Sequence, residues 1–377
     1  MYTSESTKKT SGSILIVVLM AGILFGGLLM FYLDYHQINK LSEQVSQLRT
    51  QVSVLEGTNN STYQTITILQ NGTSLSELYA NVKDSVVLIE GTTNGGSVQG
   101  SGFAYNYRGT NVILTNYHVV NDVNANSLSV TFSDGQGYAA TILGQDPYAD
   151  LAVLSVSGNH VFKPVTIVDS STLAVGEQVI AIGNPYGLVG SMTTGVVSAV
   201  GRSIRVDTAG GYSIANVIQT STAINPGNSG GLLVNSLGSV VGMTTAIVSD
   251  SQGLGFAIPS NTILREIPQL ISTGTYMSHS YLGVTGIDMS YRLAQQSGDS
   301  ITYGWRIATI VPRGPSDGKL AVNDIIIGMN DIIIKNNDDL ASYLEEHTLP
   351  GTTITLKVIR NHQETEIPIT LGERPAP

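Results

Sequence analysis

Three side chains in the middle of this 377-residue chain have the chemistry of a nucleophilic catalyst. Ser229 stands in residues 227–231 (GNSGG), a tight turn with few side chains that can present a hydroxyl and direct consecutive backbone N–H groups at one point. His118 lies at the end of an apolar stretch, and Asp150 leads into another. A hydroxyl becomes a strong nucleophile when a base takes its proton and a carboxylate orients that base. The three residues therefore predict acyl transfer.

The same serine also fits the Gly-x-Ser-x-Gly pattern of a nucleophile elbow. That arrangement needs a strand, a turn and a helix around the serine, with the Asp and the His later in the chain. Here Ser229 is followed by LLVNSLGSVVGMTT, which is typical of a strand hairpin. We therefore reject the elbow and keep the order His, Asp, Ser.

Other ionisable side chains are interpreted as structural. Asp146 precedes a proline and is interpreted as a turn residue, while His160, His279 and His362 lie in polar stretches and are expected in loops. The chain has no cysteine, which excludes thiol catalysis, disulfides and Cys-based metal sites. The formal net charge of −10 argues against nucleic acid as a partner. We expect neither a metal nor a cofactor.

Two sets of short strands must position these residues. The first set is expected at 86–90, 102–107, 111–116, 128–132, 139–145 and 152–156, and the second at 178–182, 192–200, 217–220, 231–234, 240–245 and 255–258. Turn residues separate the strands and no βαβ alternation occurs, which predicts two packed all-β barrels or sandwiches. A short helix is expected near residue 75, and another after Ser260, which would cap it, closed by Gly274.

The amino-terminal residues carry a membrane pattern. Residues 13–33 are uncharged and apolar, and about 20 such residues span a bilayer. Lys8 and Lys9 place residues 1–12 in the cytoplasm, so the catalytic part is expected outside it. A cleaved signal peptide is the alternative, but no small-residue cleavage site follows. We predict a single-pass anchor.

A stalk is expected between the anchor and the strands. Apolar residues repeat with heptad spacing over residues 34–57, which predicts a short coiled coil, although a lone amphipathic helix would give a similar pattern. So short a seam does not decide between a dimer and a trimer. Residues 58–74 form a polar linker that holds glycosylation sequons at Asn59, Asn60 and Asn71, which fits an exposed stalk.

A linked set of motifs resembles the HtrA/Deg serine proteases. The motifs are SGF, TNYHVV, DPYADLAVL, AIGNPYG, INPGNSGGLLVN and LGFAIPSN, and the resemblance covers roughly residues 75–373. It implies a mainly β, chymotrypsin-like double β-barrel protease domain over residues 75–275. By resemblance, His118 is the general base, Asp150 orients it, and Ser229 is the nucleophile.

The resemblance also implies the binding sites around this triad. The backbone N–H groups of Gly227, Asn228 and Ser229 would form the oxyanion hole. Residues 249–259 match the segment that shapes the primary specificity pocket, and residues 201–215 match a sensor loop. An apolar, uncharged pocket is expected, which would favour cleavage after Val, Ala or Leu, with ordinary core packing as the alternative. Its lining residues would be Ile224, Leu254 and Phe256.

Residues 278–373 resemble the single PDZ domain that follows many such proteases. Tyr281, Leu282, Gly283 and Val284 match the loop whose N–H groups hold a peptide carboxylate, while the peptide adds a strand to the sheet edge. Asn323 stands where the family has a glycine at a turn, and Asn tolerates positive φ well. A purely structural module is the alternative.

The expected protein is thus a membrane-anchored, extracytoplasmic, ATP-independent serine endopeptidase that degrades unfolded or misfolded polypeptides. It would work through an acyl-enzyme, bind peptide C-termini at its PDZ domain, and form a homotrimer or a multiple of one by family analogy. Two alternatives use the same fold. One is a non-proteolytic chaperone or PDZ scaffold, and the other is a regulatory protease that cleaves one membrane substrate.

Overall fold

The computed structural model describes most of the chain from residue 74 onward. The described residues are 35–40, 42–45, 74–158, 160–184, 190–205, 213–247 and 254–375. Residues 35–40 and 42–45 are helical and exposed, whereas the rest of the predicted coiled coil, the predicted anchor and nearly all of the predicted linker lie outside the described residues. No helix of the described part is long and apolar enough to cross a membrane. The described residues from 74 onward belong to one compact unit.

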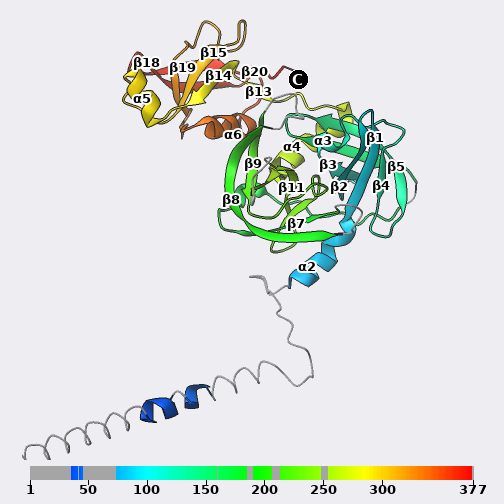
Figure 1. Ribbon diagram of the computed structural model, residues 1–377. Helices are drawn as coiled ribbons and strands as arrows, with labels where there is room; N and C mark the ends of the chain where they lie inside the picture. The colour runs from blue at the N-terminus through cyan, green and yellow to red at the C-terminus, as the bar shows by residue number, and fades with distance from the viewer. Residues whose placement is uncertain are drawn as a thin grey trace, which may run out of the picture. The chain divides into compact units, whose positions relative to one another are not determined.

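Two closed antiparallel barrels of six strands each form the middle of the chain (Figure 1). In the first barrel the strands follow the order β1-β2-β3-β6-β5-β4, and in the second β10-β11-β12-β9-β8-β7. The first consists of β1 (Val86–Thr93), β2 (Gly96–Tyr107), β3 (Thr110–Thr115), β4 (Ser129–Thr131), β5 (Gly137–Asp146) and β6 (Leu151–Val156). The second consists of β7 (Gln178–Gly183), β8 (Ser191–Arg205), β9 (Ser213–Thr220), β10 (Leu232–Asn235), β11 (Val240–Ile247) and β12 (Gly255–Pro259). The predicted double barrel is confirmed.

The strands differ from the prediction mainly in length. β2 begins at Gly96 instead of residue 102, because its glycine-rich start pairs with the end of β1 in a hairpin. β8 runs on to Arg205 and pairs with β9 through several register shifts. Such bulges bend a strand and extend a hairpin beyond its barrel.

One hydrophobic core joins the two barrels. Phe103 and Leu114 of the first barrel share it with Ile182 and Met243 of the second, and all four side chains are almost fully buried. Removing a buried aromatic side chain such as Phe103 would cost about 3–5 kcal/mol. The shared core fixes the two barrels against each other, and it therefore fixes residues contributed by either barrel.

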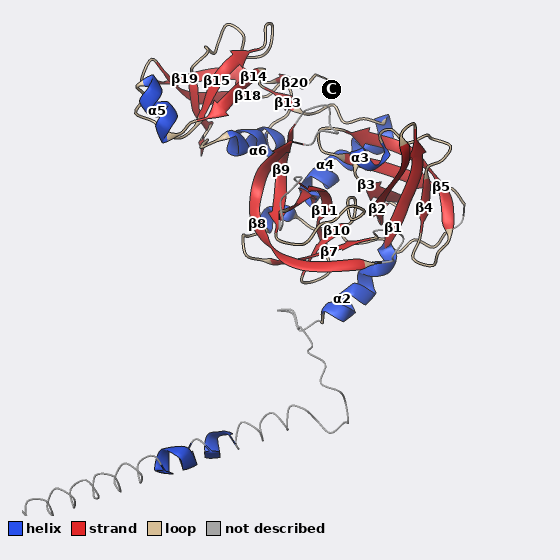
Figure 2. Ribbon diagram, viewed as in Figure 1, coloured by secondary structure: helices blue, strands red, loops and turns tan. Residues whose placement is uncertain are grey.

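Two helices contribute buried side chains to this core. α2 (Leu75–Val82) and the 3₁₀ turn η1 (Lys83–Ser85) precede β1, and a second 3₁₀ turn, η2 (Ser170–Thr172), precedes β7. α4 (Ser260–Thr273) contacts β5 and β6 of the first barrel and β11 and β12 of the second (Figure 2).

The start of α4 differs from the prediction. Pro259, not Ser260, is its N-cap residue, and the Ser260 hydroxyl instead donates to the carbonyl of Val168 at 2.5 Å. Gly274 ends the helix at φ +83°, as predicted, because glycine adopts this conformation without strain.

The carboxy-terminal residues form a second, smaller β-sheet domain. Its sheet has the order β14-β15-β16-β18-β19, so β14 is an edge strand. The strands are β14 (Val284–Asp288), β15 (Trp305–Ile310), β16 (Ile325–Met329), β18 (Thr353–Arg360) and β19 (Gln363–Thr370). Short β17 (Ile332–Ile333) pairs with β16, and β13 (Ser280–Tyr281) pairs with β20 (Gly372–Glu373). The helices are α5 (Tyr291–Ser297) and α6 (Asn337–His347), and Asn323 adopts φ +75°, as predicted for its turn.

Candidate active site

His118 and Asp150 meet on the first barrel. His118 lies in the one-turn helix α3 (Tyr117–Val120) that directly follows β3, and Asp150 directly precedes β6, which pairs with β3. The His118 ring Nδ1 lies 3.0 and 2.9 Å from the two carboxylate oxygens of Asp150. The backbone N–H of His118 donates to the same carboxylate at 3.0 Å. His118 is therefore bonded to this carboxylate both through its ring and through its backbone N–H.

Asp150 is buried and held in an unusual conformation. It is 2% exposed and has φ +53°, a left-handed value that costs free energy for a residue other than glycine. The side-chain amide of Asn116 donates to its backbone carbonyl at 3.0 Å, and the hydroxyl of Thr245 donates to its Oδ2 at 2.5 Å. A buried carboxylate without such donors would be strongly disfavoured.

The pKa of His118 reflects two opposing effects. Burial lowers it, because a cation loses hydration, but the charge of Asp150 and the hydrogen bond to it outweigh burial. The pKa is therefore raised above the ordinary value of 6.5. A raised pKa makes the imidazole a stronger base for the proton of a hydroxyl.

Ser229 lies in the turn between β9 and β10, and this turn needs its glycines. Gly227 and Gly230 have φ values of +93° and +84°. A Cβ added at Gly230 would lie 2.1 Å from the carbonyl oxygen of Ser101 on β2. The backbone N–H of Ser101 donates to the carbonyl of Ser229 at 2.8 Å, so the turn is attached to the opposite barrel.

The backbone donors of this turn are not equivalent. The N–H of Asn228 donates to the carbonyl of Asn225 at 2.9 Å, so in this conformation it is not available to a substrate. Within the described residues, the N–H groups of Gly227 and Ser229 have no acceptor. Of the three predicted oxyanion donors, these two are therefore free. Among the hydrogen bonds of the described residues, none joins the Ser229 hydroxyl to the His118 ring.

Strand β11 contacts both the nucleophile turn and Asp150, and the sequence did not predict this role. Consecutive side chains of a strand point to opposite faces. Thr244 donates to the carbonyl of Asn228 in the nucleophile turn at 2.6 Å, and Thr245 donates to Asp150. Both threonines are buried. Two adjacent hydroxyl residues in an otherwise apolar strand were the available signal, because buried polar groups need partners.

A hollow of about 240 Å³ adjoins His118. Its lining residues are Thr93, Val98, His118, Val119, Asn121, Asp122 and Val123.

The three predicted pocket residues differ in exposure. Ile224 and Phe256 are each 6% exposed, whereas Leu254 is 38% exposed. A Cβ added at Gly255 would lie 2.8 Å from Cδ1 of Ile224, so the two positions are close neighbours. Phe256 also packs into the core shared by the barrels.

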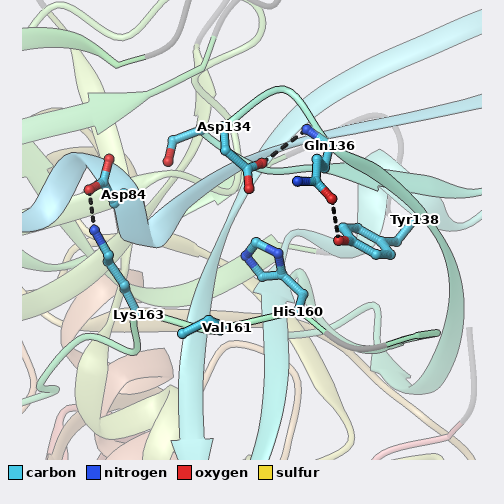
Figure 3. Close-up of a pocket in the computed structure, with 8 residues that line it drawn as sticks. Asp84, Asp134, Gln136, Tyr138, His160, Val161 and Lys163 are labelled. Atoms are coloured by element: carbon cyan, nitrogen blue, oxygen red, sulfur yellow. Dashed lines mark hydrogen bonds and ion pairs between the residues drawn. The ribbon is translucent and has the colours of Figure 1, made fainter.

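A different hollow, of about 490 Å³, contains none of the predicted site residues (Figure 3). Its polar side chains are largely engaged with one another. Lys163 pairs with Asp84 at 2.5 Å, and the hydroxyl of Tyr138 donates to Gln136 at 2.9 Å. His160 stacks on Phe132 with ring centroids 3.5 Å apart.

The predicted carboxylate loop follows β13 in the PDZ domain. Tyr281 pairs with β20, Leu282 is buried in the domain core, and Val284 begins the edge strand β14. Gly283 has φ +75°, and its carbonyl accepts from the N–H of Val311 at 2.9 Å. Within the described residues, the N–H groups of Leu282 and Gly283 have no acceptor. Two free donors beside an open strand edge suit a carboxylate-ended peptide.

Asp146 accepts from the backbone N–H of Tyr148 in the turn after β5, and His279 lies in the loop between α4 and β13, as predicted, but their burial and pairing were not predicted. Both are buried, and His279 Nε2 lies 2.7 Å from Oδ2 of Asp146. The other ring nitrogen lies 3.2 Å from Glu345 of α6. Burial on its own would lower the pKa of His279, but the two carboxylates outweigh it and raise that pKa to about 10. His279 is therefore a buried cation between two anions.

More charged groups surround this pair. Arg265 of α4 bonds to Glu345 and lies 3.0 Å from Glu266. Burial raises the pKa of Glu266 well above its usual value. Asp146, Glu266 and His279 offer donor atoms within 4.8 Å of one another, but Asp146 and His279 are already paired and Glu266 contacts a guanidinium. The cluster is a charge-balanced network that attaches α6 to α4.

Helix α6 also contacts the β8–β9 hairpin, whose far end is the predicted sensor loop. Asp338 accepts from the backbone N–H of Ser203 at 2.8 Å, and the hydroxyl of Ser342 donates to the carbonyl of Gly201 at 2.9 Å. The PDZ domain is thus bonded to the strands that lead into residues 206–212, which lie outside the described residues.

The double barrel, its Asp–His pair and its glycine-flanked serine define a trypsin-like peptidase followed by a PDZ domain. A model of the trypsin-like peptidase domain matches residues 100–243, and a model of the PDZ domain matches residues 280–371. A solved structure of the HtrA-type protease AlgW with a tripeptide is 32% identical, with a TM-score of 0.64, and the match covers 79% of this chain and 98% of that one. The chain belongs to the HtrA-type protease family.

Curated relatives agree with this assignment. A probable periplasmic serine endoprotease, DegP-like, from Chlamydia muridarum is 39% identical over 74% of this chain and 55% of its own length. The serine protease Do-like HtrA from Bacillus subtilis is 37% identical over 74% of this chain and 64% of its own length. The chain thus spans between about half and two thirds of the length of these relatives.

Proposed function

We propose that this protein is a serine endopeptidase in which Ser229 is the nucleophile, His118 the general base and Asp150 the orienting carboxylate. The Asp150–His118 pair carries the proposal, because a half-buried imidazole of raised pKa, paired with a buried carboxylate and followed in the chain by a glycine-rich serine turn, has few other uses. Membership in a protease family supports it independently.

The chemistry we propose is that of a Ser-His-Asp triad. The Ser229 hydroxyl attacks the carbonyl carbon of the scissile peptide as its proton passes to Nε2 of His118. The imidazolium then holds its Nδ1–H toward Asp150. The oxyanion receives hydrogen bonds from the free N–H groups of Gly227 and Ser229. His118 returns the proton to the leaving amine, and water hydrolyses the acyl-enzyme with the same imidazole as base.

The substrates we propose are unfolded or misfolded polypeptides with apolar residues before the cleaved bond. Buried Ile224 and Phe256 favour an apolar pocket, and Leu254 would close it at the solvent side. The free edge of β14 and the N–H groups of Leu282 and Gly283 would receive peptide C-termini. Because no step needs a nucleotide, the activity would be ATP-independent.

The setting proposed for this activity rests on the sequence. The apolar residues 13–33 support a single-pass anchor, with the catalytic domain extracytoplasmic. A homotrimer, or a multiple of one, is proposed by analogy with the family. Degradation of damaged proteins outside the cytoplasm would be the resulting role.

One experiment tests the activity. The full chain, in detergent, is incubated with unfolded casein and with a fluorophosphonate probe, beside Ser229→Ala. We expect cleavage and labelling by the wild type only. An unlabelled, inactive wild type would overturn the proposal, and if Ser229→Ala still suppresses aggregation, a chaperone role is favoured. A preference for Lys or Arg before the cleaved bond would overturn the apolar pocket.

A further inference from the structure

Two buried hydroxyl groups, one from each barrel, hold the turn that carries Ser229. The Thr244 hydroxyl on β11 donates to the carbonyl of Asn228 at 2.6 Å. The Ser101 hydroxyl on β2 donates to the carbonyl of Gly227 at 2.5 Å. Ser101 is 0% and Thr244 1% exposed, so both hydroxyl groups are shielded from water. Two consecutive peptide groups of the turn are therefore each bonded to a side chain.

The peptide between Asn228 and Ser229 is held from one side only. Its carbonyl accepts both the Thr244 hydroxyl and the N–H of Gly231, at 2.6 and 2.9 Å, which occupies both lone pairs. A trans peptide is planar, so its N–H points opposite to its carbonyl. The Ser229 N–H is therefore directed away from β11, and within the part of the chain that the structure describes it has no acceptor. Donation to the carbonyl also polarises the N–H and strengthens it as a donor.

The preceding peptide is held at both ends. Its carbonyl, on Gly227, accepts from Ser101, and its N–H, on Asn228, donates to Asn225 at 2.9 Å. The Ser101 oxygen also accepts from the N–H of Asn184 at 2.7 Å, so its single proton is committed to Gly227. This peptide cannot rotate without breaking both hydrogen bonds. The Gly227–Asn228 peptide is therefore fixed, and only the orientation of the Asn228–Ser229 peptide remains to be set.

We propose that Thr244 is a positioning residue of the oxyanion hole. Its hydroxyl fixes and polarises the peptide that ends in the Ser229 N–H, while Ser101 fixes the peptide before it. Thr244 touches no reacting atom and acts through that N–H. The inference rests on the proposed peptidase activity. It assigns to Thr244 the orientation of the Ser229 N–H, which stabilises the oxyanion. Its effect should therefore fall on the transition state, and not on substrate binding.

Thr244→Val tests this, because valine keeps the shape and removes the donor. In the full chain we expect kcat on unfolded casein to fall about 10–100-fold, with KM within about 2-fold, since losing an oxyanion donor outright costs about 100–1,000-fold. Affinity for a peptide boronate, which forms a tetrahedral adduct with the serine, should fall by a similar factor. Affinity for a non-reacting peptide of the same sequence should not change. Thr244→Ser should recover most of the activity.

Ser260→Ala is the matched control, because it also removes a hydrogen bond from a buried hydroxyl to a backbone carbonyl. It should leave kcat and the boronate affinity unchanged. Wild-type kcat in Thr244→Val, or equal losses for the boronate and the non-reacting peptide, would overturn the inference while the peptidase activity stood. An inactive wild type would overturn the peptidase itself. If Thr244→Val does not fold, Thr244→Ala removes the same hydroxyl. It must then lose kcat and boronate affinity while its KM and its affinity for the non-reacting peptide stay unchanged.

Discussion

The hydroxyl of Thr245 lies 2.5 Å from Oδ2 of Asp150, and it joins a carboxylate of the first barrel to a strand of the second. That carboxylate oxygen also faces the His118 ring. A donor to the carboxylate limits its rotation and therefore fixes the orientation of the imidazole. The alignment of the base thus depends on how the two barrels are packed.

Thr245→Val should therefore weaken catalysis without removing it. We expect kcat/KM on unfolded casein to fall about 10-fold, because Asp150 keeps its bonds to His118 but loses a charge-assisted hydrogen bond worth about 1.5–3 kcal/mol. Thr245→Ser, which keeps the donor, should retain near wild-type activity. Unaltered kcat/KM in a folded Thr245→Val protein would show that His118 alone orients the carboxylate.

The pH dependence of activity should follow His118. Its pKa is raised above 6.5, and only the neutral imidazole can accept the Ser229 proton, so kcat/KM should rise with pH through a midpoint above 6.5. In Asp150→Asn the effects that raise the His118 pKa disappear, while burial, which lowers it, remains. The residual activity should therefore have a lower pH midpoint. Profiles of kcat/KM from pH 5 to 9 measure both. A wild-type midpoint below 6.5 would contradict the ion pair with Asp150.

The barrels and the nucleophile turn could be predicted from sequence because their determinants are local. Alternating apolar residues indicate each strand, and the positive φ values at Gly227 and Gly230 explain why this turn contains glycines. Asp150 was recognisable because an acidic residue beside a buried strand needs a partner. Each of these signals lies within a few residues of the feature that it specifies.

The remaining features depend on residues far apart in the chain. Asp146 and His279 are separated by 133 residues, and each alone has the ordinary sequence context of a turn or a loop. The packing of α4 against β5, and the backbone bond from Gln145 to Gly274, bring them together. The two hydroxyls of β11 present the same difficulty, because their acceptors are backbone and side-chain atoms that no local pattern identifies.

Replacing His279 should weaken the attachment of the PDZ domain in a pH-dependent way. Its pKa is raised to about 10, so its contribution to stability is complete below its unfolded value near 6.5 and is lost as the pH rises through 10. His279→Gln should therefore cost about 3–5 kcal/mol at pH 6.5, as expected for breaking a buried ion pair, and much less above pH 10.

The single tryptophan, Trp305, lies in the PDZ domain, so its fluorescence during urea unfolding measures this effect. His362→Gln is the matched control, because His362 also faces a carboxylate but its side chain is 62% exposed. That variant should unfold like the wild type at both pH values. An equal loss of stability for His279→Gln at pH 6.5 and above pH 10 would show that the imidazole contributes packing and not charge.

Gly230→Ala should abolish activity for steric reasons. The added Cβ would lie 2.1 Å from the Ser101 carbonyl and 2.5 Å from Oγ1 of Thr115, so the nucleophile turn must move away from β2. We expect fluorophosphonate labelling to slow more than about 100-fold, since small misplacements of reacting groups cost about that much. Gly109→Ala is the control, because Gly109 has a similar φ of +89° but open space around it. It should lose about 1 kcal/mol of stability and label normally. Equal labelling of both variants would show that the contact with Ser101 does not fix the serine.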